Sequence, residues 1–325
     1  MKKIKSDMPG DVVEIGPDQK EKAENIFSKL FAELKENIEN KDKIVVSLYG
    51  GSGSGKSSFA VLLAQMFGEK GIGHYVISGD NYPRRIPVEN DMMRQKIYDE
   101  SGVDGLRRYL CGPDEIDYDT INNILEQFKR GKDILSLKRM GTKKEDIWFE
   151  DVDVSDISII ILEWTHGNNE NLKNIDYPIY LHSTPELTYQ RRVKRNRNAN
   201  AGSDFISLVL KLEQEKLLGQ VAGAKMIVDI DGSIISYKEY VEKYEDFDIR
   251  PMLNVYPDSI NGNVSGLIEF IKSYTSGFFF FTWKFTVLPI LICIPFLLLI
   301  VLFVPYLACE KMCRISVVER IRSGE

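Results

Sequence analysis

Hydrophobic positions near the start of the chain recur with the period of a helix. Between Asp18 and Asn40, apolar side chains appear every three or four residues among charged ones, which is the pattern of an amphipathic α-helix. The apolar positions are Ile26, Phe27, Leu30, Phe31, Leu34 and Ile38. We expect this helix to cover a core, and residues 1–42 are predicted to form an N-terminal extension made of a strand and this helix.

From Lys43 onward, short apolar runs alternate with helical or polar stretches. The runs are IVVSLY, HYVIS, DILSL, ISIIILEW, PIYL and KMIVDI. Short buried strands that alternate with helices predict an α/β fold with a mostly parallel sheet and helices on both faces. We assign residues 43–276 to this domain. The charged, turn-rich segment 137–153 is expected to form a small hairpin or an excursion from the sheet.

The pattern changes at Gly277, where an almost uninterrupted apolar run begins. The stretch 285–309 contains no charged residue, and about twenty apolar residues suffice to cross a bilayer as a helix. Residues 277–325 are therefore predicted to form a hydrophobic C-terminal helix, which tethers the protein to a membrane, and a short basic tail. A re-entrant or interfacial position of the segment, or a tail without an anchoring role, stays open.

Charge and cysteine content narrow the functional classes. The 325-residue chain has a formal net charge of −6 and only four cysteines. An acidic chain lacks the basic footprint of a protein that binds polymeric nucleic acid, and no disulfide framework or zinc spacing is visible. We expect no nucleic-acid partner and a cytoplasmic location for the main domain.

A glycine-rich loop between the first strand of this domain and the following helix carries the strongest chemical signal. Its residues are Gly50, Gly51, Ser52, Gly53, Ser54, Gly55, Lys56, Ser57 and Ser58. The pattern G-x-x-x-x-G-K-S in this context predicts a P-loop NTPase fold, because the loop amides and the helix N-terminus surround phosphate oxygens. We expect ATP and Mg²⁺ to bind here, with Lys56 on the β- and γ-phosphates in a catalytic role and Ser57 on the metal.

Polar residues after the second strand of the domain are candidates for the acceptor side. Asp80 is predicted to be the general base that accepts the proton of an attacking hydroxyl. We expect Tyr82, Arg84 and Arg85 to bind the acceptor, with the two arginines on an anionic group. The alternatives are a turn or helix cap for Asp80 and a solvated surface for the arginines.

Two further groups of charged residues complete the predicted site. Glu163 ends the strand ISIIILE, where a carboxylate would orient Mg²⁺ together with Ser57. A later cluster is expected to close over the phosphates as a lid, with a solvated basic helix as the alternative. The cluster consists of Arg191, Arg192, Arg195 and Arg197.

Together these residues predict a kinase that transfers the γ-phosphoryl group of Mg·ATP to a hydroxyl of a small molecule. A phosphate loop is shared by several classes of protein, so one alternative is a membrane-tethered P-loop ATPase or switch without a small-molecule acceptor. Another is a subunit of a membrane assembly. The oligomeric state and the acceptor are left undetermined.

The order of these motifs resembles the phosphoribulokinase and uridine kinase family over about 43–232. The resemblance lies in GGSGSGKS, the Asp80 segment, GPDEIDYD, ILEWTHG and RRVKRN, and it implies a catalytic base at Asp80 and a lid arginine at Arg195. The chain departs from the family pattern at Asn196, at LSLKRMG and at Trp164. Locally, GGSGSGKSS and SGDNYPRRI are also similar to adenylylsulfate kinases, which makes adenylylsulfate an alternative acceptor.

Overall fold

The computed structural model describes residues 2–5, 7, 12–141, 143, 146–184, 188 and 204–244. The chain divides into two compact units, Met1–Asp258 and Ser259–Glu325. The second unit, with the predicted hydrophobic helix and the membrane segment 285–309, lies outside the described residues. Within the described part, no helix is both long enough and apolar enough to cross a membrane.

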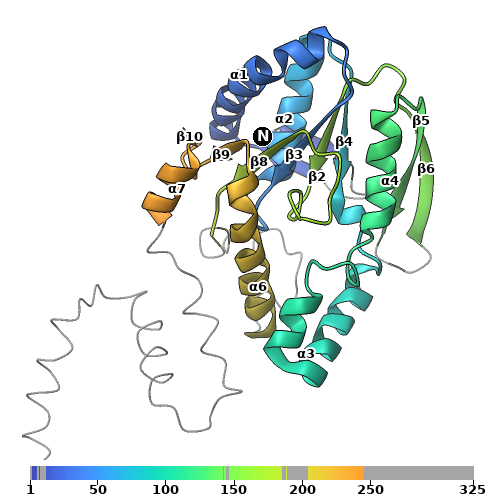
Figure 1. Ribbon diagram of the computed structural model, residues 1–325, viewed down its shortest axis with the longest axis vertical. Helices are drawn as coiled ribbons and strands as arrows, with labels where there is room; N and C mark the ends of the chain where they lie inside the picture. Colours follow the sequence, from blue (N-terminus) through green and yellow to red (C-terminus); the bar gives the residue numbers. More distant parts are fainter. Residues whose placement is uncertain are drawn as a thin grey trace, which may run out of the picture. The chain divides into compact units, whose positions relative to one another are not determined.

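Strands and helices alternate between residues 17 and 109, and several strands follow one another later in the described chain (Figure 1). The strands are β1 (Lys2–Lys5), β2 (Val12–Ile15), β3 (Ile44–Tyr49), β4 (His74–Ser78), β5 (Ile134–Met140), β6 (Ile147–Asp153), β7 (Ile159–Glu163), β8 (Tyr177–Leu181), β9 (Met226–Val228) and β10 (Ile234–Ile235). The α-helices are α1 (Pro17–Glu39), α2 (Lys56–Glu69), α3 (Pro87–Tyr109), α4 (Tyr118–Lys129), α6 (Asp204–Gln220) and α7 (Tyr237–Tyr244). Two 3₁₀ turns, η1 (Gly79–Asn81) and η3 (Val221–Gly223), follow β4 and α6.

Six strands form the central sheet in the order β10-β9-β8-β3-β7-β4. The strands β9, β8, β3, β7 and β4 run parallel, and β10 pairs with β9 in the antiparallel direction. Parallel strands buried on both faces consist of continuous apolar runs, and β3 and β7 are buried at every position. The predicted α/β sheet is confirmed.

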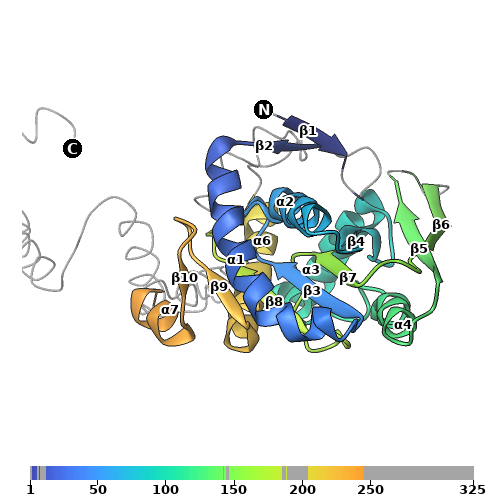
Figure 2. The same cartoon turned by 90° about the horizontal axis from the view of Figure 1, so that it is seen from above.

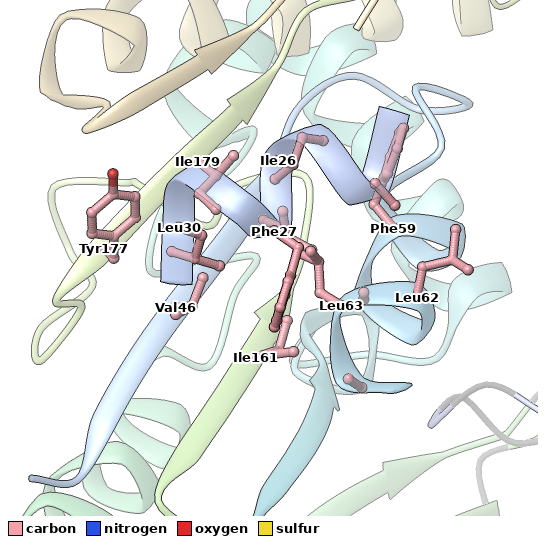
Figure 3. Packing of buried hydrophobic residues seen from close by; sticks show 14 of the residues in the cluster. Ile26, Phe27, Leu30, Val46, Phe59, Leu62, Leu63, Ile161, Tyr177 and Ile179 are labelled. Carbon is pink, nitrogen blue, oxygen red and sulfur yellow. The ribbon is translucent and has the colours of Figure 1, made fainter. Parts of the chain in front are cut away.

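Helices cover both faces of this sheet (Figure 2). Side chains alternate between the faces of a strand, so Val46 of β3 packs with α1 and α2 whereas Val45 packs with α4. Figure 3 shows Ile26, Phe27 and Leu30 of α1 packed among side chains of α2 and the sheet. Burying one such side chain contributes about 1.5–3 kcal/mol, and the N-terminal helix is thus part of the same core as the sheet.

The strand β5 differs from its prediction. The run DILSL was expected in the parallel sheet, but β5 pairs only with β6 among the described strands, in a separate two-stranded antiparallel sheet. Its register runs from Ile134 opposite Asp153 to Met140 opposite Ile147. A short turn can join antiparallel strands, whereas a parallel partner requires a long crossover. The expected hairpin in segment 137–153 is therefore present, but it also includes the run DILSL.

Candidate active site

The phosphate loop joins β3 to α2 and is held close to the end of β8. Gly50 has φ = 153° and Gly55 has φ = 101°, conformations that side-chain-bearing residues rarely adopt. A Cβ at Gly50 would lie 2.4 Å from the carbonyl oxygen of Leu181, so only glycine fits there. The loop leads directly into the first turn of α2, where unpaired amides and the helix dipole attract anions. This geometry fits a polyphosphate.

Lys56 is the first residue of α2, and its ammonium group is held at the loop. Its Nζ donates hydrogen bonds to the carbonyl oxygens of Gly50 at 3.0 Å and of Gly51 at 3.1 Å. The side chain is only 8% exposed. A buried lysine needs polar partners to offset its loss of hydration, and the loop carbonyls provide them. The positive charge therefore lies beside the loop that would hold the phosphates.

Ser57, on the first turn of α2, meets Glu163 at the end of β7. Glu163 is the last residue of β7 and lies opposite Leu48 of β3 in the parallel register. The Oγ of Ser57 donates a hydrogen bond to Oε1 of Glu163 at 3.0 Å. The structure thus places together the two residues predicted to bind the metal. Mg²⁺ in kinases uses few protein oxygens and completes its octahedron with phosphates and water, and this hydroxyl–carboxylate pair fits such a site.

Asp80 lies in the turn that follows β4, the next strand of the sheet. It belongs to η1, directly after β4, and Ser78 of β4 lies opposite Glu163 of β7. Asp80 is exposed, whereas Gly79 and Asn81 on either side of it are buried. The carboxylate is therefore free to face a ligand while its backbone is fixed. In a parallel sheet the carboxyl ends of the strands converge on one ligand crevice. Asp80 and the phosphate loop both follow such ends, those of β4 and β3.

Trp164, one of the departures from the family pattern, packs against the turn that carries Asp80. A Cβ added to Gly79 would lie 2.0 Å from Cγ of Trp164, so the indole packs directly on this glycine. Trp164 is also within 5.8 Å of the ring centre of Tyr118 and is nearly fully buried. The tryptophan thus forms one wall against the turn that carries Asp80.

Three predicted acceptor-binding residues have other contacts. Arg84 donates through Nε to the carbonyl oxygen of Pro113 at 2.6 Å and forms long ion pairs with two aspartates. Arg85 donates to the hydroxyl of Tyr109 and the carbonyl oxygen of Asp114. Both arginines hold the loop before α4. Tyr82 is fully buried in the hydrophobic core, which does not fit its predicted contact with an acceptor.

The predicted lid lies outside the described residues. This applies to Arg191, Arg192, Arg195 and Arg197, and their role stays a prediction. The described chain resumes with α6, whose Glu213 and Gln214 line a small cavity together with Gly51 and Ser52 of the phosphate loop. The helix after the lid therefore borders the phosphate loop.

A buried ionic cluster on the acceptor side was missed by sequence analysis. Arg94 of α3 donates to Oε1 of Glu115 at 2.5 Å and to Oε1 of Glu213 at 2.9 Å. Glu115 also accepts hydrogen bonds from Asn90 and from the backbone amide of Cys111. Arg94 and Glu213 lie on ordinary amphipathic helices without a motif. Only Glu115 lies within a recognisable segment, GPDEIDYD.

The pKa values of the two glutamates move in opposite directions. Burial by itself raises the pKa of Glu115, but Arg94 and the hydrogen bonds from Cys111 and Asn90 outweigh it and lower the pKa below its ordinary value. Burial raises the pKa of Glu213; Arg94 opposes this shift, while the negative charges of Glu115 and Asp80 add to it. A like charge nearby disfavours ionisation.

His166 is a neutral, buried histidine. Burial lowers its pKa to about 3, and its Nε2 lies 3.1 Å from Sγ of Cys111. At neutral pH it carries no charge that could act on the phosphates.

Comparisons with known proteins place the chain in a family. Residues 45–212 match the phosphoribulokinase / uridine kinase family. The chain is 46% identical over 212 residues to a bifunctional alpha-galactosidase/sucrose kinase, AgaSK, of Mediterraneibacter gnavus. That match covers 65% of this chain but only 22% of the relative, so the chain spans about a fifth of the length of this curated protein.

Solved structures with similar folds share little sequence with the chain. A possible uridine kinase from Bacillus stearothermophilus is 17% identical, with a TM-score of 0.44, over 64% of this chain and 97% of that one. Phosphoribulokinase from Rhodobacter spheroides is 16% identical, with a TM-score of 0.45, over 58% and 70%. D-glycerate 3-kinase from Cryptococcus neoformans is 14% identical, with a TM-score of 0.44, over 66% and 97%. We transfer no function from these structures.

The family match covers more than half of the chain and includes the phosphate loop, Asp80 and Glu163. It agrees with the resemblance seen in the motifs and with the parallel sheet that carries them. The chain therefore belongs to the phosphoribulokinase / uridine kinase family.

Proposed function

We propose that this chain is an ATP-dependent kinase that phosphorylates a hydroxyl group of a neutral sugar. One observation carries the proposal: the phosphate loop, the Ser57–Glu163 pair and Asp80 follow β3, β7 and β4, which are adjacent in the sheet. This arrangement supports a nucleotide site, a metal site and a base that lie close together. Phosphoryl transfer to a hydroxyl uses groups of these three kinds.

The proposed reaction is an in-line transfer of the γ-phosphoryl group of ATP. Bound Mg²⁺ would neutralise charge on the β- and γ-phosphates. Lys56 and the loop amides hold the phosphates, and Ser57 and Glu163 hold the metal. Asp80 accepts the proton of the attacking hydroxyl as the oxygen–phosphorus bond forms and the bond to ADP breaks. Positioning and electrostatic stabilisation supply most of the rate in such sites.

The charges on the acceptor side support a neutral acceptor. Asp80 is exposed directly after β4, Glu213 borders the phosphate loop, and Arg94 is already shared by two glutamates. Arg84 and Arg85 hold the loop before α4. An anionic acceptor would meet like charges there, whereas sugar hydroxyls donate hydrogen bonds to carboxylates. This argument disfavours adenylylsulfate and sugar phosphates as acceptors.

The relative from Mediterraneibacter gnavus is named as a sucrose kinase, and its name suggests a sugar for this chain. The alignment covers only 22% of that protein, so its name alone does not assign the acceptor. Because of that name, sucrose is the first acceptor to test. The segment 285–309 stays a proposed membrane tether for a cytoplasmic kinase domain. The alternative function is a P-loop switch without an acceptor, and the following assay distinguishes it from a kinase.

The test is an assay of the purified full-length chain with Mg·ATP and a panel of acceptors. The panel contains sucrose, glucose, fructose and galactose, their phosphates, uridine and adenylylsulfate. ADP release and phosphorylated product are followed together, with Lys56→Ala as the inactive control. We expect product only with a neutral sugar. Preference for a phosphorylated acceptor would refute the acceptor class, and slow hydrolysis indifferent to every acceptor would refute the kinase proposal.

A further inference from the structure

A buried carboxylate from the N-terminal segment reaches the turn that carries Asp80. Asp7 lies in the connection between β1 and β2, and its side chain is only 7% exposed. Its Oδ2 accepts a hydrogen bond from the backbone amide of Ser78 at 2.8 Å. The side-chain amide of Asn81 lies 3.5 Å from the same oxygen. Asp7 thus contacts the residues on both sides of the Gly79–Asp80 pair.

The contact to Ser78 has a simple structural basis. β4 is the edge strand of the central sheet, with β7 as its only partner there among the described strands. The outer edge of such a strand presents amide groups without a neighbouring strand. A carboxylate that accepts from one of them replaces the missing partner and fixes the end of β4.

Arg139 compensates the charge of Asp7. Its Nη1 donates to Oδ1 of Asp7 at 2.6 Å, and its side chain is also 7% exposed. The same guanidinium donates to Glu150 of β6 at 2.8 Å and to the hydroxyl of Tyr75 of β4 at 2.9 Å. A buried carboxylate is costly unless it is paired and hydrogen-bonded. Asp7 meets this condition only when the N-terminal segment, β4 and the β5–β6 hairpin are all in place.

The turn Gly79–Asn81 is therefore confined by three sets of contacts. Trp164 packs on Gly79, and the backbone amide of Met140 in β5 donates to Oδ1 of the fully buried Asn81 at 3.1 Å. Asp7 and Arg139 close the remaining side through Ser78 and Tyr75. The exposed residue of the turn is Asp80, so its direction is set by contacts of its neighbours rather than by contacts of its own.

We propose that Asp7, paired with Arg139, is a positioning residue that holds the turn carrying Asp80 in the geometry needed for proton transfer from the acceptor. We assign its effect to the hydrogen bond with the Ser78 amide, and its side chain also lines a cavity together with Ser57 and Glu163. The inference rests on the proposed function, because it assigns Asp80 as the base. It gives the N-terminal segment a role in the reaction.

The first test compares Asp7→Asn with the wild-type chain. The amide keeps the volume and one acceptor oxygen but loses the charge that Arg139 pairs with. We expect kcat for the sugar to fall by about 10²-fold, because small misplacements of a reacting group have effects of this size. The affinity for Mg·ATP should stay within about twofold, since the phosphate loop is untouched. The matched control is Asp18→Asn, which removes an exposed carboxylate from the same part of the chain.

The ratio of phosphorylated sugar to ADP separates positioning from mere stabilisation. Lost stability lowers the amount of active enzyme and leaves the ratio near that of the wild type. A misplaced base lowers the ratio, because water then competes with the poorly activated sugar hydroxyl. We expect the ratio to fall in Asp7→Asn and to remain unchanged in Asp18→Asn. A loss of kcat at an unchanged ratio, together with a lower unfolding midpoint, would overturn the proposal.

A second variant, Asp7→Glu, provides a test if Asp7→Asn does not fold. Asp7→Glu keeps the charge for Arg139 but moves the carboxylate by one methylene, so the fold should persist while the Ser78 contact changes. We expect kcat to fall severalfold at a nearly unchanged unfolding midpoint. Wild-type kcat in this variant and in Asp7→Asn would overturn the proposal.

Amide hydrogen exchange tests the contact without any catalytic activity. The Ser78 amide should be protected in the wild type and exchange at least tenfold faster in Asp7→Asn, because its acceptor is weakened, while amides of β3 stay unchanged. Equal exchange in both proteins would overturn the positioning contact. If the wild type forms no sugar phosphate, the proposed function fails, and this measurement still decides whether Asp7 holds the turn.

Discussion

At the scale of single residues, the site depends on a few side chains whose chemistry the motif already indicates. Lys56 and Ser57 are adjacent in the sequence and lie on the first turn of α2, beside the phosphate loop. Glu163 is brought to Ser57 from a distant part of the chain by the pairing of β3 with β7. Asp80 is exposed on a buried frame. These positions support the separate chemical role that we propose for each residue.

Asp80→Asn should separate catalysis from nucleotide binding. The amide is almost the same size but cannot accept the proton of the acceptor hydroxyl, so kcat should fall by about 10²–10⁴-fold. The dissociation constant of Mg·ATP, measured by calorimetry, should change by less than about twofold. The control Asp119→Asn removes an exposed carboxylate of α4 and should retain near wild-type kcat. An Asp80→Asn enzyme with wild-type kcat would show that another group accepts the proton.

At the scale of elements, the charge of Arg94 connects three segments on the acceptor side, namely α3, the loop before α4, and α6. The guanidinium of α3 binds Glu115 in the loop before α4 and Glu213 in α6. Around it, Leu106 of α3 and Leu212 of α6 belong to one hydrophobic cluster. The ion pairs therefore fix how α3 and α6 approach each other beside the phosphate loop.

Arg94→Met should destabilise the protein strongly. The methionine fills much of the space but leaves the fully buried Glu115 and the partly buried Glu213 without their cation, a change that costs about 3–5 kcal/mol of unfolding free energy. Urea unfolding measures the effect. Arg107→Met is the matched control on the same helix, because Arg107 is 32% exposed and its contact to Glu215 of α6 is 3.4 Å long. A loss below about 1 kcal/mol in Arg94→Met would contradict the role assigned to the cluster.

The pH dependence of stability should reflect His182, which ties β8 to α7. Burial lowers its pKa to about 4, and its ring lies 4.0 Å from that of Tyr244 and 5.2 Å from that of Tyr240. The unfolded chain takes up a proton near pH 6.5, before the folded protein does. Stability from this group is therefore complete above about pH 6.5 and is lost as the pH falls toward about 4.

The expected loss between these pH values is about 2–3 kcal/mol, since each pKa unit corresponds to about 1.4 kcal/mol. Urea unfolding of the wild type and of His182→Gln between pH 7 and 4 provides the measurement. The variant should show a flatter dependence, although His166, whose pKa is also lowered by burial, still contributes. Parallel curves for the two proteins would show that His182 is not the responsible group.

At the scale of the whole molecule, the described unit contains the complete set of proposed catalytic groups apart from the lid. Its core is built from α1, α2, α4 and both faces of the sheet, and the N-terminal segment reaches the active site through Asp7. The N-terminal extension 1–42 is thus continuous with the catalytic domain in its packing. The hydrophobic segment 285–309 is outside the described residues, and its role stays a prediction.

Membrane attachment is tested with the full-length chain. Flotation with phosphatidylcholine vesicles should carry the wild type to the lipid fraction. The double variant Leu298→Arg/Val301→Arg should remain in the dense fraction, because each arginine at the centre of a span costs about 2.5–3.5 kcal/mol on insertion scales. Equal flotation of both proteins, or flotation of neither, would argue against a tether formed by this segment.

The sequence by itself determined the local elements and the chemistry of the phosphate loop. Loop glycines, a lysine and a serine between a strand and a helix act through neighbouring backbone groups, so short-range pattern is sufficient to identify them. The same holds for α1, whose apolar positions recur with the helical period. It also holds for the strands β3, β4, β7, β8 and β9, which are short, mostly continuous apolar runs. The family resemblance carried by these motifs is confirmed.

Only the tertiary structure decided which distant residues meet. The pairing of β5 with β6, the burial of Tyr82, the partners of Arg84 and Arg85, and the Arg94 cluster depend on contacts between segments far apart in the chain. Asp7 is the clearest case, since a single aspartate in a polar segment has no periodic or motif signal. Its proposed role depends on the Ser78 amide at the edge of β4 and on the charge of Arg139. A carboxylate is stable in a buried position only where the folded chain supplies a hydrogen-bond donor and an opposite charge.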